Sequence, residues 1–81
     1  MPKPRKLSGT NLIKIFERFD FVIADQKGSH VKLKRITGSG VKQILTIPIH
    51  KELDKGTLVS IYKQSLRYIP EEELREYFYS D

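Results

Sequence analysis

The sequence predicts an α+β fold in which a three-stranded antiparallel sheet carries helices on one face. Hydrophobic residues recur with a helical period up to Phe19, alternate with a period of two from Phe21 onward, and return to a helical period in the last third of the chain. Two turn segments, residues 27–29 and 37–40, divide the alternating part into three runs. The predicted order is therefore α-β-β-β-α followed by a short C-terminal helix, within a single domain of residues 1–81.

The first predicted helix covers residues 9–19. Ser8 is a suitable N-cap, because its hydroxyl can accept a hydrogen bond from the first helical turn. Leu12, Phe16 and Phe19 then follow at spacings that place them on one face of a helix. This apolar face predicts that the helix packs against the sheet.

Three short strands with alternating hydrophobicity follow the first helix. They are expected at residues 21–26, 30–36 and 41–47. In the first strand, alternation places Phe21, Ile23 and Asp25 on the same face. Gly28 favours a tight turn before the second strand, since glycine tolerates positive φ. Pro48 is expected to end the third strand, because proline has no N–H to donate to a neighbouring strand.

A second long helix is predicted after the sheet, with Asp54 and Thr57 as alternative N-caps. Its apolar positions recur at helical spacing from Leu58 onward. A last helix is expected at Pro70, whose fixed φ suits a first helical turn. The glutamates at residues 71–73 favour this position as well, because they would lie near the positive end of the helix dipole.

Charge is distributed unevenly along the chain, whose formal net charge is +5. Residues 1–51 contain eleven Lys and Arg against three Asp and Glu, whereas residues 52–81 contain four against seven. A basic body of this kind favours a polyanionic partner such as RNA. A lysine-rich surface without a specific partner is the alternative, and charge alone does not decide between them.

Composition disfavours several kinds of site. The chain has no cysteine, which excludes disulfides and thiolate metal sites and fits a cytoplasmic protein. His30 and His50 are 20 residues apart and have no carboxylate cluster beside them, which disfavours zinc. The sequence contains no P-loop and no apolar run near the roughly 20 residues of a membrane span. We therefore expect no cofactor, no metal and no membrane partner.

The second predicted strand carries the candidate site. Alternation points Val31 and Leu33 towards the helices, and His30, Lys32 and Lys34 towards the opposite, solvent-facing side. Four further residues are expected beside this row, from the preceding turn and the third strand: Lys27, Gly28, Ser29 and Lys42. The result is a basic surface with one histidine in it.

Such a surface suits the cleavage of RNA without a metal. The 2′-hydroxyl must lose a proton to attack the adjacent phosphate, the leaving 5′-oxygen must gain one, and histidine can serve either transfer near neutral pH. Lysine side chains would offset the charge that grows on the phosphate. We therefore expect His30 to be catalytic and the residues around it to bind RNA. His50 is a weaker candidate, because it can simply complete backbone hydrogen bonds where the third strand ends.

Two other functions remain open on the residues alone. A histidine after Gly-Ser is commonly an ordinary turn residue, and the same basic face would then serve a non-catalytic RNA-binding module. A protein-interaction adaptor is the third possibility. It would show no RNA affinity, whereas phosphate-driven binding would weaken steeply as the salt concentration rises.

The sequence resembles the HicA mRNA interferase toxins. Gln26-Lys27-Gly28-Ser29-His30 is similar to the central motif of that family, and Lys6-Leu7-Ser8-Gly9 is similar to its opening. Its closing half is represented by Ile47-Pro48-Ile49-His50, Lys55-Gly56-Thr57-Leu58, Ser60-Ile61 and Lys63-Gln64. The collinear match covers about residues 5–67. The family's Ala-Gly after Lys-Gln is replaced by Ser65-Leu66-Arg67-Tyr68, and residues 68–81 form an extension with little family pattern.

The resemblance implies a fold like the double-stranded-RNA-binding domain. It implies the toxin of a type II toxin–antitoxin system, an endoribonuclease that cleaves mRNA and arrests translation, with His30 as the essential residue. It also implies a HicB-type antitoxin as protein partner, covering the active face. DNA binding is not expected of this chain alone.

Overall fold

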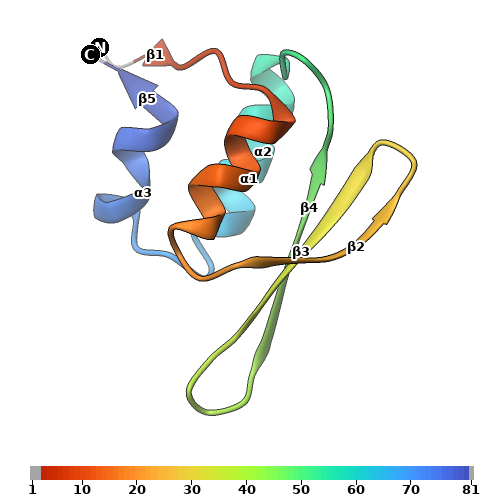
Figure 1. Cartoon of the computed structure of the whole chain (residues 1–81). Coiled ribbons are helices and arrows are strands. Elements are labelled where there is room, and N and C mark those ends of the chain that lie inside the picture. The colour runs from red at the N-terminus through yellow and green to blue at the C-terminus, as the bar shows by residue number, and fades with distance from the viewer. Residues whose placement is uncertain (1–2, 81) are drawn as a thin grey trace.

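The computed structural model describes residues 3–80, and Figure 1 shows how the helices and strands are arranged. The elements in chain order are β1 (Lys3–Pro4), α1 (Gly9–Glu17), β2 (Val22–Lys27), β3 (His30–Ile36), β4 (Lys42–Pro48), α2 (Lys55–Ser65), α3 (Glu71–Phe78) and β5 (Tyr79–Ser80). The helices α1 and α2 lie against one face of a twisted sheet, and the other face is left open (Figure 1). This architecture confirms the predicted α+β fold.

The main sheet has the order β2-β3-β4, with antiparallel neighbours throughout. Lys27 lies opposite His30, so Gly28 and Ser29 alone connect β2 to β3. Gly28 has a φ of +56°, the conformation that favours glycine at the first central position of a two-residue hairpin turn. The strand β4 ends at Pro48, one residue beyond the predicted end at residue 47.

The predicted alternation of the first strand is wrong beyond Ile23. Ile23 lies opposite Leu33 and Asp25 lies opposite Lys32, so Ala24 is an extra residue in β2. Such a β-bulge shifts the following side chain to the other face of the sheet. Asp25 therefore shares the open face with Lys32, instead of the helix-covered face with Ile23.

The core fills the space between the sheet and the helices. The strand β2 is exposed along its whole length, so the buried side chains come from the other main elements and from the segments between them. They include Leu12, Phe16, Phe21, Val31, Leu33, Leu45, Ile47, Leu58, Ile61, Ile69, Leu74 and Phe78. The last three belong to the C-terminal extension, where the sequence has little family pattern. The extension therefore takes part in the same core as the sheet.

The first helix begins behind Ser8, as predicted. The Ser8 hydroxyl accepts a hydrogen bond from Asn11 N–H at 3.0 Å, and the Asn11 side chain accepts one from Ser8 N–H at 3.0 Å. Gly9 lies so close to the end of β4 that an added Cβ would stand 2.8 Å from Ile49 Cα. Its N–H donates to the His50 carbonyl at 3.0 Å. This contact fixes the end of β4 against α1.

The second helix is capped by Asp54, which settles the choice between the two candidates. Its carboxylate accepts a hydrogen bond from Thr57 N–H at 2.7 Å. Hydrogen bonds from Thr57 hold the pKa of Asp54 below its ordinary value, and the nearby His50 lowers this pKa to a smaller extent.

The helix α2 has 11 residues. No helix within residues 3–80 combines the length and the apolar character that crossing a membrane requires.

The two described ends of the chain form a second, two-stranded sheet that the sequence does not predict. β1 and β5 pair in antiparallel fashion, and Figure 1 shows them side by side. Arg5 N–H donates to the Phe78 carbonyl at 2.7 Å, and its side-chain Nε donates to the Glu76 carbonyl at 3.1 Å. These contacts hold α3 against the N-terminal segment.

Candidate active site on the open face of the sheet

Side chains of β3 alternate between the core and the open face. Val31 and Leu33 are buried to 1% and 0% exposure. His30 and Lys32, which alternate with them, are exposed. Lys34 points to the same side and is half-buried. The alternation expected from the sequence is therefore confirmed, and His30 stands on the side that no helix covers.

His30 lines an open hollow of about 180 Å³ together with Asp25, Lys27, Lys32 and Thr46. The register explains this grouping, because side chains directly opposite each other on antiparallel strands project to the same face. Lys27 is opposite His30, and Lys32 lies between Asp25 on β2 and Thr46 on β4. The structure thus brings together three of the expected site residues, Lys27, His30 and Lys32.

The turn before His30 is tied to the end of β4. Ile49 N–H donates to the Ser29 carbonyl at 2.6 Å, and the strand pairing places His30 opposite Pro48. Gly9 fixes the same end of β4 to α1. The backbone that carries His30 is therefore held in place by both β4 and α1. Gly28 and Ser29 are exposed there, beside the hollow.

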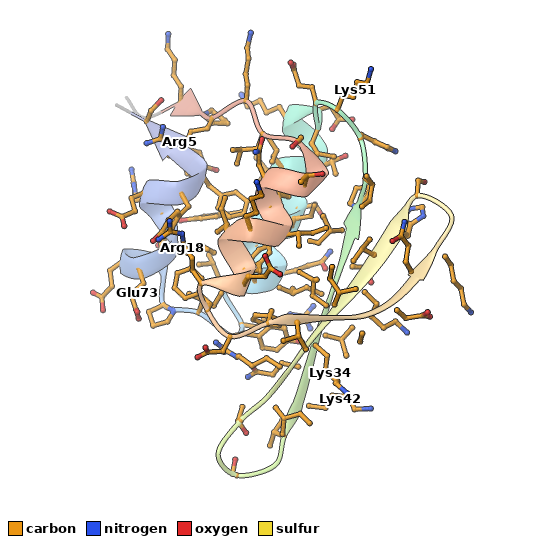
Figure 2. The ribbon with its side chains drawn as sticks, in the orientation of Figure 1. Arg5, Arg18, Lys34, Lys42, Lys51 and Glu73 are labelled. Carbon is orange, nitrogen blue, oxygen red and sulfur yellow. The ribbon has the colours of Figure 1, made fainter. Side chains whose placement is uncertain are left out.

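Lys34 and Lys42 belong to the open face but lie further from His30. Lys34 is opposite Ile44, and Lys42 is opposite Ile36 at the other end of the strand pair. Figure 2 shows both lysines near each other, on the side of the sheet away from the helices. Ile36 is 59% exposed, so this part of the open face is both basic and apolar. These lysines extend the basic surface beyond the hollow.

Sequence reasoning missed two residues of the hollow, Asp25 and Thr46. Regular alternation predicts the wrong face for Asp25, because the β-bulge at Ala24 leaves no trace in the hydrophobic pattern. Thr46 could have been found from the register of β3 and β4, which brings it opposite Lys32. The bulge therefore adds a carboxylate to a surface that the sequence presents as purely basic.

His50 is not among the described residues that line the hollow. Its carbonyl accepts the hydrogen bond from Gly9, and its side chain is exposed near Asp54 at the start of α2. Within residues 3–80, no group of three or more His, Cys, Asp or Glu side chains is placed to hold a metal ion. The chemistry that the hollow offers is that of one imidazole, one carboxylate, one hydroxyl and two ammonium groups.

Comparison with known proteins yields one family. A family model described as "HicA toxin of bacterial toxin-antitoxin" matches residues 9–65, which span α1, the whole main sheet and α2. No curated protein and no solved structure matches the chain. The matched segment contains every residue of the hollow and more than half of the sequence. The chain therefore belongs to the HicA family of toxins of bacterial toxin–antitoxin systems.

Proposed function

We propose that this toxin is an endoribonuclease that cuts mRNA on the open face of its sheet, with His30 as the catalytic residue and without a metal ion. The observation that carries the proposal is the position of His30, exposed in the hollow between Lys27 and Lys32. Membership of a toxin family supports it, because cleavage of mRNA would arrest translation.

The proposed reaction is a transesterification within the RNA chain. The 2′-oxygen forms a bond to the adjacent phosphorus, and the bond from phosphorus to the 5′-oxygen breaks. One proton leaves the 2′-hydroxyl and one arrives at the 5′-oxygen, so the products end in a 2′,3′-cyclic phosphate and a 5′-hydroxyl. His30 carries one of these protons, and such general acid–base catalysis is worth roughly 10²–10⁴-fold in rate.

The cations around His30 support the same reaction. Lys27 and Lys32 line the hollow, where their ammonium groups would offset the extra negative charge on the phosphate in the transition state. Gly28 and Ser29 leave room beside the imidazole and would present backbone N–H groups to the substrate. Lys34 and Lys42 continue the basic surface along the strands, where they would bind phosphates that flank the cut.

The family implies an antitoxin partner. We propose that the partner is of the HicB type and covers the open face. An acidic surface would complement Lys32, Lys34 and Lys42, and apolar side chains would complement the exposed Ile36. A bound antitoxin would then exclude RNA from His30.

The reaction itself provides the test. Cut sites are first mapped on an mRNA transcript incubated with the purified protein in EDTA. We expect cleavage in EDTA, 2′,3′-cyclic phosphate ends, and loss of cleavage at a site whose 2′-hydroxyl is replaced by hydrogen. Products with 3′-hydroxyl ends, or cleavage that requires added Mg²⁺, would contradict the proposal. RNA that is bound but left whole would identify a non-catalytic RNA-binding module instead.

A further inference from the structure

The proposed reaction uses the imidazole and the lysines of the hollow and assigns no role to the carboxylate of Asp25. Asp25 is exposed, lies opposite Lys32, and lines the same hollow as His30. His30 lies two positions before Lys32 on β3 and therefore faces the same side. Asp25 and His30 are therefore diagonal neighbours, with α-carbons about 7–8 Å apart in such pairs and side chains able to approach one phosphodiester.

A carboxylate at this position opposes RNA binding. Like charges repel, so Asp25 would weaken the attraction of the phosphate to Lys27 and Lys32. The β-bulge at Ala24 nevertheless turns Asp25 to the open face, whereas regular alternation would point it to the other side. A group that disfavours binding and is still placed at the reacting centre is best explained by a chemical task.

We propose that Asp25 is the general base of the cleavage reaction and that His30 is the general acid. This inference rests on the proposed function and deepens it, because it assigns both proton transfers. Among the described residues of the hollow, the lysine side chains have no free electron pair when charged, and the carboxylate of Asp25 is a pure acceptor when ionised. Protonated imidazole, in contrast, is a donor.

The two groups balance the reaction. The 2′-hydroxyl gives its proton to an Asp25 carboxylate oxygen as the 2′-oxygen bonds to phosphorus. The phosphorus–5′-oxygen bond breaks as His30 gives its proton to the 5′-oxygen. The enzyme is left with a protonated carboxyl and a neutral imidazole, and exchange of one proton through solvent restores the starting state.

Substitution of Asp25 separates chemistry from binding. We expect Asp25→Asn to lower the saturating single-turnover rate by about 10²–10⁴-fold. RNA affinity should stay equal or increase, because a negative charge has left the surface. Asp25→Glu should recover part of the rate. The control is Glu17→Gln, which removes one charge from an exposed position on α1, behind the sheet, and should cleave like the wild type. An Asp25→Asn variant with wild-type rate would overturn the proposal.

The direction of each proton transfer is tested with a modified substrate. An RNA with sulfur in place of the 5′-oxygen at the cut site needs no general acid, because a thiolate leaves readily. We expect this substrate to restore cleavage by His30→Ala to near the wild-type rate and to leave Asp25→Asn slow. Rescue of Asp25→Asn, or no rescue of His30→Ala, would overturn the assignment.

The catalytic role of His30 and the catalytic role of Asp25 can fail separately. If unmodified RNA is cut at the wild-type rate by His30→Ala, the proposed function is wrong in its catalytic residue. If His30→Ala is inactive and Asp25→Asn is fully active, the proposed function stands and only the role of Asp25 is wrong.

Discussion

The two faces of β3 have different roles, one in the core and one on the exposed surface, although their residues alternate along a single strand. The helix-covered face carries Val31 and Leu33, which are buried in the core. The open face carries His30 and Lys32, which remain exposed. Neighbours one position apart should therefore have different consequences on substitution: loss of stability on one face, and loss of RNA binding or cleavage on the other.

The largest expected effect on stability comes from Leu33, which has no exposed surface. Leu33→Ala should lower the free energy of unfolding by about 2–5 kcal/mol, since it leaves a cavity in the core. Urea denaturation measures this change. The matched variant is Lys32→Ala, the preceding residue on the open face, with an expected change within about 0.5 kcal/mol. Equal losses in the two variants would break the distinction between the faces.

Arg35 sharpens the comparison, because it is a charged residue on the helix-covered face. Its guanidinium donates to Gln43 Oε1 at 2.7 Å, to the Phe19 carbonyl at 2.9 Å and to the Tyr68 carbonyl at 2.7 Å. It also lies 4.8 Å from the centroid of the Phe21 ring.

Replacement of Arg35 by lysine keeps the charge but loses the fork of donors. Arg35→Lys should lower the free energy of unfolding by about 1–3 kcal/mol, because half-buried carbonyls lose their partners. Thermal or urea denaturation is the measurement. Arg18→Lys, at an exposed position beside Tyr77, is the control and should change stability little. A stable Arg35→Lys protein would show that the three hydrogen bonds contribute nothing.

Lys34 on the open face should affect binding and leave folding almost unchanged. Lys34→Gln should reduce the slope of log affinity against log salt by about 0.7, the value for one phosphate contact to single-stranded RNA. Binding to an uncleavable 2′-deoxy-substituted RNA at several salt concentrations measures the slope. Lys14→Gln, on the exposed side of α1, should leave it unchanged. Identical slopes for wild type and Lys34→Gln would show that Lys34 does not contact an RNA phosphate.

The smallest effect is a titration on the helical side of the molecule. Burial and the hydrogen bond from Tyr62 to Glu71 raise the pKa of Tyr62 to about 12. Since the folded value lies above the ordinary one of 10.0, the stability linked to this group is complete below pH 10 and is lost as the pH rises towards 12. Phenolate absorbance should show one late tyrosine, absent in Tyr62→Phe. If the wild type and Tyr62→Phe showed no difference in phenolate absorbance at high pH, the raised pKa of Tyr62 would be contradicted.

Much of the fold was predictable because it depends on local patterns. The cap at Ser8, the glycine turn before His30 and the alternation of β3 are all recorded in neighbouring residues. The placement of His30 on the open face follows from the same alternation. The last helix is predicted by Pro70, by the glutamates that follow it and by the helical period of its apolar residues.

What could not be predicted depends on residues far apart in the sequence. The pairing of β1 with β5 joins the two described ends of the chain. The contacts of Arg35 reach Phe19 and Tyr68 on other segments. The bulge at Ala24 is fixed by how β2 fits against β3, so the presence of Asp25 beside His30 emerges only from the folded sheet.

The most direct test of the central claim is the single-turnover cleavage rate of His30→Ala at saturating protein concentration. Its matched control is His50→Ala, the other histidine, which stands exposed outside the hollow. We expect His30→Ala to be slower by about 10²-fold or more, with RNA affinity and unfolding free energy close to wild type, and His50→Ala to cleave normally. Cleavage by His30→Ala at the wild-type rate would contradict the catalytic role of His30.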